Sequence, residues 1–336
     1  MKQLLLLFIF FSMVSLVDAS QLSRTKPMLP LQVGAESIIP LWDLADTVLQ
    51  QNLEKVLYKN HTWQQMIQKK KMTVGIVDLT DPSKVHFASV NGDEMMYAAS
   101  LPKLAILLTA FYCFENKIIK QTPGVMKDLA LMIRKSDNQA ASRMIERVTM
   151  ERIQKVLTME CFGFYDEAHG GGLWVGKKYA RSGKRMPEPM KGLSHAATAS
   201  QVCRFYYLLA MGKLISRERS REMLGILVNP GIDHKFVKTL RKISPDSTLF
   251  RKSGTWKTWH SDSVLVWGSG WRRYIAVALI DDPQGEMILR QLIPEIEKTL
   301  KLAAKKSKST SIALGNFPQE ERGSGGGAPI MTHDFF

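Results

Sequence analysis

Cysteine is scarce in this sequence: Cys113, Cys161 and Cys203 are the only three in 336 residues. Three thiols are too few for a disulfide framework, and at least one of them must stay unpaired. None lies in a context typical of a nucleophile, and Cys113 and Cys203 fall within apolar stretches, where a free thiol behaves as a small hydrophobe. We therefore predict three free, buried cysteines.

Acidic residues are outnumbered by basic ones, 31 to 46, which gives a formal net charge of +15. Such an excess is compatible with binding to nucleic acid, to an anionic membrane surface or to an anionic polymer such as cell wall. The sequence has no zinc-finger spacing, no arginine-rich helix and no recognisable nucleic-acid module, which favours a scattered basic surface and no nucleic-acid partner. No set of metal ligands is evident, and no cofactor is expected.

Long apolar runs are missing beyond the N-terminus, where a membrane-spanning helix would need roughly 20 such residues. Residues 1–19 have the features of a secretory signal: Lys2 at the start, an apolar core from Leu4 to Val17, and small residues before Ser20. We expect an exported protein, periplasmic or secreted, with no transmembrane segment after cleavage. An uncleaved N-terminal anchor is the alternative.

The remaining chain is long enough for one large domain or two lobes. Its periodicity predicts strands near both ends of this stretch and mostly helices between them, which is typical of an α/β (α+β) protein. The predicted segments are a leader at 20–38, an α/β lobe at 39–98 and 229–302, a helical lobe at 99–228 that includes an aperiodic loop at 163–197, and a disordered tail at 303–336. The expected helices are 41–57, 125–134, 139–148, 199–214, 217–228 and 286–302, and the expected strands are 72–78, 85–90, 247–255, 263–267 and 274–280.

The stretch around Ser100 is the strongest chemical signal. In Ser100-Leu-Pro-Lys103 a hydroxyl and an amine stand three residues apart, so that both lie on one face of a helix beginning near Ser100. Pro102 suits the first turn of that helix, and the apolar run after Lys103 predicts that the helix is buried. Backbone N–H groups at its start would favour a developing oxyanion. An isolated Ser-x-x-Lys pattern, however, is more often a solvated surface pair.

Two later motifs change that judgement. Ser136-Asp-Asn138 lies between two predicted helices, where such residues often serve only as a cap. Lys252-Ser-Gly254 closes a predicted strand and is followed by Thr255. The three motifs in this order resemble those of the serine β-lactamase and penicillin-binding protein superfamily, and the chain is most similar to class A β-lactamases. The resemblance covers residues 40–302 and implies the β-lactamase/transpeptidase-like fold, in which an antiparallel sheet of about five strands is flanked by helices and carries an inserted all-helical lobe.

The resemblance also implies roles for individual residues. Ser100 would be the nucleophile, with Lys103 as its base in a neutral form, and Ser136 would pass the proton to the leaving nitrogen between Lys103 and Lys252. Substrate-binding residues would be Asn138, for an amide oxygen, and Ser253, Gly254 and Thr255, for a carboxylate. The backbone N–H groups of Ser100 and Thr255 would form the oxyanion hole.

The loop at 163–197 departs from the class A pattern. It lacks the Glu-x-x-Leu-Asn motif whose glutamate activates the deacylating water. Glu188 is the only acidic residue in the second half of the loop; it is a candidate for that base, but a solvated loop charge is the favoured interpretation. Beyond the third motif, Trp256 and Trp259 either line the site or pack against the sheet, and His260 is expected to be a surface or packing residue.

These observations predict an exported serine hydrolase that forms an acyl-enzyme at Ser100 and hydrolyses a β-lactam-type amide. One alternative is a penicillin-binding D-alanyl-D-alanine carboxypeptidase, or a related peptidase or esterase acting on a peptidoglycan stem peptide. Another is a non-catalytic module that binds an anionic cell-wall polymer. Without a deacylating base, the acyl-enzyme formed with a β-lactam should be long-lived.

Overall fold

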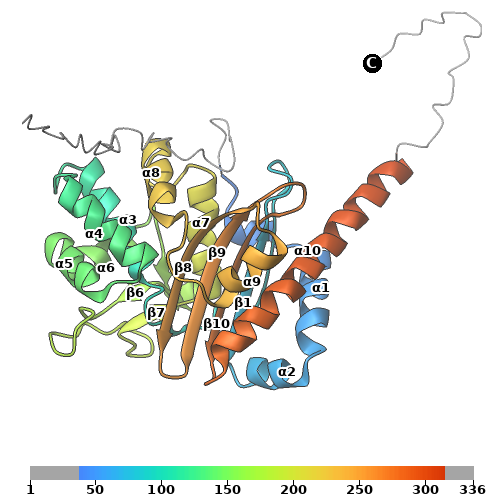
Figure 1. Cartoon of the computed structure of the whole chain (residues 1–336), viewed down its shortest axis with the longest axis horizontal. Coiled ribbons are helices and arrows are strands. Elements are labelled where there is room, and N and C mark those ends of the chain that lie inside the picture. Colours follow the sequence, from blue (N-terminus) through green and yellow to red (C-terminus); the bar gives the residue numbers. More distant parts are fainter. Residues whose placement is uncertain (1–37, 315–336) are drawn as a thin grey trace, which may run out of the picture.

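The structure, a computed structural model, describes residues 38–314. The predicted signal at 1–19, nearly all of the predicted leader and residues 315–336 lie outside the described part. Figure 1 shows a central sheet with helices on both faces. None of the helices in residues 38–314 combines the length and apolarity needed to cross a membrane.

The sheet has five strands in the order β2-β1-β10-β9-β8, and every neighbouring pair is antiparallel. This confirms the predicted fold class. Strand β8 lies at the edge, next to the helical lobe, with β9 as its only neighbour in this sheet. The strands are β1 (Met72–Asp78), β2 (His86–Val90), β8 (Thr248–Trp256), β9 (Trp259–Trp267) and β10 (Arg273–Asp281).

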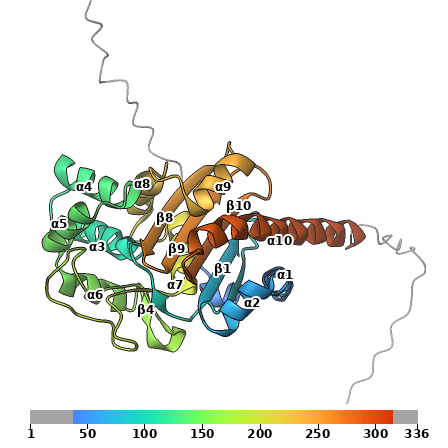
Figure 2. The ribbon, with the colours of Figure 1, turned by 60° about the horizontal axis from the view of Figure 1, so that its bottom comes forward.

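Both faces of the sheet are covered, so its central strands β1 and β10 are largely apolar, whereas β9 also buries polar residues at 260–263. Alternate residues of β10 point to opposite sides: Tyr274 and Ala276 enter one core, whereas Ile275 and Val277 enter the other. Figures 1 and 2 show α10 crossing one face. That face packs against α1 (Thr47–Tyr58), α2 (His61–Gln68), α9 (Lys235–Ile243) and α10 (Gly285–Leu314).

The other core joins the sheet to the helical lobe. Helix α7 packs directly against β1 and β10 although the sequence assigned it to that lobe. A side chain at Gly75 on β1 would place its Cβ only 2.8 Å from Cys203 Sγ, so glycine allows this close packing. The helices on this side are α3 (Lys103–Glu115), α4 (Pro123–Arg134), α5 (Asn138–Val148), α6 (Met150–Thr158), α7 (Ala199–Ala210) and α8 (Arg217–Leu227).

Small strands join the loop at 163–197 to the segment before Ser100. These strands were not predicted, because the sequence of the loop has no clear periodicity. Strands β3 and β6 flank β7 in one small sheet, and β4 pairs with β5 in another. A short 3₁₀ helix, η3 (Glu167–His169), lies between β4 and β5. These strands are β3 (Met96–Tyr97), β4 (Tyr165–Asp166), β5 (Gly171–Gly172), β6 (Trp174–Val175) and β7 (His195–Ala197).

Three further predictions were wrong in detail. The expected helix at 41–57 is divided into the 3₁₀ helix η2 (Leu41–Leu44) and α1, because the Asp46 side chain caps α1 by accepting from Leu49 N. Helix α10 runs through Pro294 to Leu314, so the predicted tail begins too early at residue 303. All three cysteines are free, but Cys161 is exposed and only the other two are buried.

Candidate active site

Ser100 lies in the tight turn between β3 and α3. The buried backbone before it is fixed, because Ala98 N donates to His195 O at 2.8 Å and Ala98 O accepts from Ser261 Oγ at 2.8 Å. Ala99 adopts a left-handed φ of 51°, which is uncommon for a side chain with a Cβ and concentrates at functional sites. Ser100 itself is partly exposed. The nucleophile predicted from the sequence is therefore both held rigidly and reachable.

Lys103 is fully buried at the start of α3, which begins at this residue rather than at Ser100. Its Nζ lies 2.7 Å from Ser136 O, 2.8 Å from Asn138 Oδ1 and 3.3 Å from Asp137 O. Burial lowers the pKa of Lys103 to about 7, with the nearby Asp137 opposing that change. A substantial fraction of the amine is thus neutral at physiological pH, as a general base requires.

Ser136 lies between the two lysines that the motifs supply. Its Oγ is 3.0 Å from Lys252 Nζ and 3.5 Å from Lys103 Nζ, and its backbone has a left-handed φ of 56°. Burial lowers the pKa of Lys252 well below its ordinary value, and the positive charge of Lys103 lowers it further. The first, second and third motifs are therefore brought together in one cluster.

Gly254 brings strand β8 against the nucleophile. A Cβ at this position would lie 2.6 Å from Ser100 N and 2.3 Å from Ala98 O, so any side chain here would collide with the backbone. Thr255, the residue expected to supply the second N–H of the oxyanion hole, follows Gly254 directly in β8. Asn138 Oδ1 already accepts from Lys103, and this leaves its NH₂ group as the donor for a substrate carbonyl.

Two residues behind β8 were missed by the sequence reasoning. His234 Nε2 lies 3.3 Å from Ser253 Oγ. The buried Lys235 donates to Thr255 Oγ1 at 2.8 Å and to the carbonyl oxygens of Gly254 and Ser261. Burial lowers the pKa of Lys235 to about 7. No short motif marks these residues, because only tertiary packing brings the start of α9 to the end of β8.

Glu188 is buried, with 1% of its surface exposed, so the interpretation as a solvated loop charge was wrong. Its carboxylate accepts four hydrogen bonds: Oε2 from Tyr165 OH at 2.9 Å and Met190 N at 2.7 Å, and Oε1 from Lys191 N at 2.6 Å and Leu193 N at 3.0 Å. Two carboxylate oxygens offer about four acceptor positions. All are occupied by the loop itself, which disfavours a role as the base that activates water.

The aromatic residues beyond the third motif divide between the two faces of the sheet. Trp259 packs against Tyr97, with ring centroids 5.2 Å apart, on the side of the nucleophile. His260 is buried, and a Cβ at Gly285 would meet its ring, which places it against the start of α10 as a packing residue. Trp256 is 55% exposed at the end of β8. Among the three, Trp259 packs nearest to the segment that precedes Ser100.

The model of the Beta-lactamase enzyme family, Beta-lactamase2, matches residues 120–304 of this chain. The chain belongs to this beta-lactamase family. The match includes the second and third motifs and begins after Ser100 and Lys103, so the first motif depends on the geometry above. A comparison with curated proteins finds no match.

Solved structures share the fold at low sequence identity. A beta-lactamase from Sphaerobacter thermophilus is 16% identical, with a TM-score of 0.57 over 76% of this chain and 97% of that one. PBP-A is 17% identical, with a TM-score of 0.56 over 78% and 97% of the two chains. A PBP-A mutant, solved as an acyl-enzyme complex with penicillin G, is 18% identical, with a TM-score of 0.55 over 80% and 100%.

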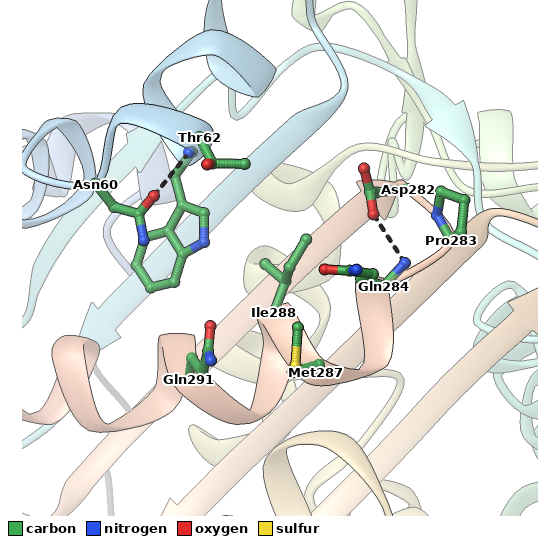
Figure 3. A pocket seen from close by; sticks show the side chains of 9 residues that line it. Asn60, Thr62, Asp282, Pro283, Gln284, Met287, Ile288 and Gln291 are labelled. Carbon is green, nitrogen blue, oxygen red and sulfur yellow. Dashed lines mark hydrogen bonds between the residues drawn. The ribbon is translucent and has the colours of Figure 1, made fainter.

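A separate pocket of 460 Å³ lies where the starts of α2 and α10 meet (Figure 3). None of the motif residues lines it. Within residues 38–314, no group of three or more His, Cys, Asp or Glu side chains is arranged to hold a metal ion. The pocket is lined by Asn60, Thr62, Trp63, Asp282, Pro283, Gln284, Met287, Ile288 and Gln291.

Proposed function

We propose that this member of the beta-lactamase family is a serine hydrolase that is acylated at Ser100 by β-lactam-type amides and releases the acyl group slowly. The observation that carries this proposal is the lysine pair: Lys103 and Lys252 are both buried, both have lowered pKa values, and both contact Ser136 beside the reachable Ser100. Such an arrangement supplies a base and a proton relay to a hydroxyl nucleophile.

In the acylation step, Ser100 Oγ forms a bond to the amide carbonyl carbon and gives its proton to neutral Lys103. The N–H groups of Ser100 and Thr255 stabilise the oxyanion. The carbon–nitrogen bond then breaks, and the leaving nitrogen takes a proton through Ser136 Oγ, which Lys252 holds. Ser253 and Thr255, supported by Lys235, are the groups that would bind a substrate carboxylate.

The slow release of the acyl group is inferred from the loop at 163–197. The carboxylate of Glu188 is saturated by loop donors, so a water beside the acyl-enzyme gains no base from it. The same observation favours the second candidate function, a D-alanyl-D-alanine carboxypeptidase or a related peptidase or esterase, in which a β-lactam acts as an inhibitor that stays attached.

Intact-mass measurement after incubation with penicillin G tests the proposal, with Ser100→Ala as control. We expect a persistent adduct of one penicillin mass on the wild-type chain and none on the variant. A transient adduct with fast consumption of the drug would contradict slow release. No adduct would contradict acylation and favour the binding module. Release of D-alanine from a stem peptide assays the peptidase candidate directly.

Export remains part of the proposal. The basis is residues 1–19 alone, and we expect the mature chain recovered outside the cytoplasm to begin near Ser20. Edman degradation or intact mass of the expressed protein measures this. Recovery of the full-length chain from the membrane fraction would favour the uncleaved anchor instead.

A further inference from the structure

An aromatic side chain that belongs to none of the three motifs closes the loop side of Lys103. Tyr179 lies on a narrow hairpin of residues 176–186, called the loop finger here. Hydrogen bonds close its base, since Gly176 N donates to Ser194 O at 2.7 Å and Met186 N donates to Gly176 O at 2.7 Å. The tip at 180–184 is exposed, whereas Tyr179 is partly buried against the lobe.

The contacts of Tyr179 hold it beside Lys103 and against the backbone that precedes Ser100. Lys103 Nζ lies 4.5 Å from the centre of its ring, and its hydroxyl donates to Ala99 O at 3.3 Å. On the other side its ring is 4.4 Å from the ring of His195. The neighbouring Lys178 pairs with Glu146 of α5 at 2.8 Å, which holds the loop finger on the helical lobe.

The ring occupies a side of Lys103 that the second motif leaves uncovered. The hydrogen-bond acceptors of Lys103 Nζ all come from residues 136–138, and the Tyr179 ring faces the same nitrogen. Burial raises the pKa of the Tyr179 phenol well above its ordinary value of 10, so this group stays protonated and is no base. The Tyr179 ring therefore contributes by covering one side of Lys103 Nζ.

We propose that Tyr179 is a positioning residue that keeps water away from Lys103 and thereby sets the lifetime of the acyl-enzyme. The inference rests on the proposed acylation of Ser100. Hydrolysis requires a water oxygen to bond to the ester carbonyl carbon while the bond from that carbon to Ser100 Oγ breaks. One proton of the water passes to Lys103 and reaches Ser100 Oγ, and the other leaves with the acid product. The Tyr179 ring occupies the space beside Lys103 in which this water would otherwise bind.

Acyl-enzyme lifetimes of Tyr179→Ala and Tyr179→Phe test this inference. Each variant and the wild type are loaded with penicillin G, freed of excess drug, and followed by intact mass. We expect Tyr179→Ala to lose its adduct on the order of tenfold faster than the wild type. Tyr179→Phe keeps the ring and loses only the hydrogen bond to Ala99, so its lifetime should match that of the wild type. Arg181→Ala, at the exposed tip of the same loop finger, is the matched control and should also keep the wild-type lifetime.

The outcomes separate this inference from the proposed function. An adduct on the wild type with the same lifetime in Tyr179→Ala would overturn the role of Tyr179 alone, and so would an equal shortening in Tyr179→Phe. A wild type that forms no adduct would overturn the acylation proposal, and this inference with it. Thermal unfolding of each variant shows that the lifetimes compare folded proteins, and Tyr179→Leu replaces the alanine variant if that one is unfolded.

Discussion

The two sides of the candidate active site, called here the motif wall and the loop wall, use their buried polar groups differently. On the motif wall, which adjoins Ser100, Lys103 and Lys252 both contact Ser136. On the loop wall, the carboxylate of Glu188 binds the backbone of its own loop, and Tyr179 presents an aromatic ring to Lys103. The motif wall has the groups that acylation needs, whereas the loop wall offers no free base for hydrolysis.

The largest effect is expected from Lys103→Met, which removes the base of the motif wall. Positioned bases contribute about 10²–10⁴-fold to rate, and acylation of Ser100 should slow by that factor. Stopped-flow or quenched intact-mass measurement of adduct formation checks this. Lys120→Met, an exposed change just beyond α3, is the control. An acylation rate within twofold of the wild type would remove Lys103 from the mechanism.

Glu188→Gln tests whether the loop wall is structural. An amide can accept at only one oxygen and would place N–H donors against the donors that now bind the carboxylate. Loss of hydrogen bonds to a buried charged acceptor should lower the free energy of unfolding by about 1.5–3 kcal/mol. Denaturant unfolding measures this, with Glu167→Gln, an exposed change in the same loop, as control. A wild-type stability combined with a slower loss of the adduct would instead assign Glu188 to deacylation.

The pH dependence of acylation reports on the motif wall alone. Because burial lowers the pKa of Lys103 to about 7, the fraction of neutral base, and with it the acylation rate, should rise about tenfold per pH unit below 7 and level off above it. The folded state binds this proton less tightly than the unfolded state, whose lysine has a pKa near 10.5. The contribution of Lys103 to the free energy of unfolding therefore rises from pH 7 to about 10.5. A rate that is flat between pH 5.5 and 8 would contradict the assignment.

Lys235→Met should have the smallest effect, because Lys235 acts through β8. It removes the donor to Thr255 Oγ1 and to two buried carbonyl oxygens. An unsatisfied buried acceptor costs about 1–3 kcal/mol. We therefore expect the second-order rate constant for acylation by carboxylate-bearing β-lactams to fall roughly tenfold. A substrate without the carboxylate should be affected less. Lys242→Met, exposed on the same helix, is the control, and equal losses for both substrates would indicate a general loss of stability.

The sequence predicted the motif wall well because its information is local. A buried helix after Ser100, a polar turn at Ser136 and a strand that contains Gly254 each follow from nearby residues. Their convergence was implied by the resemblance of their order to that of the β-lactamase superfamily. Five strands of the sheet were predicted from strand composition and flanking turns, but β9 begins at Trp259 and not at residue 263, because its first half is polar.

The loop wall could not be predicted, because its contacts join residues with no shared periodicity. From its sequence context Glu188 was interpreted as a surface charge. In the structure, four donors of the same loop bind its carboxylate. Tyr179 belongs to no sequence motif. Lys235, which lies outside the loop, was missed as well, because it contacts β8 only through the packing of α9. The exposure of Cys161 was missed because the burial expected for Cys113 and Cys203, which lie in apolar stretches, was extended to it. Cys161 lies in the turn that follows α6.

The position of β8 at the sheet edge has a mechanical consequence. From Arg251 to Trp256 this strand has β9 as its only strand partner, and Lys235 adds hydrogen bonds to Gly254 and Thr255, whereas Phe250 is also bridged to Val228. Because β9 is itself paired with β10 from Trp259 to Trp267, a bulky ligand gains room with least disruption by displacing the turn between Trp256 and Trp259 and the end of β8. Complexes with ligands of increasing size should differ most at residues 256–259 and least at Phe250.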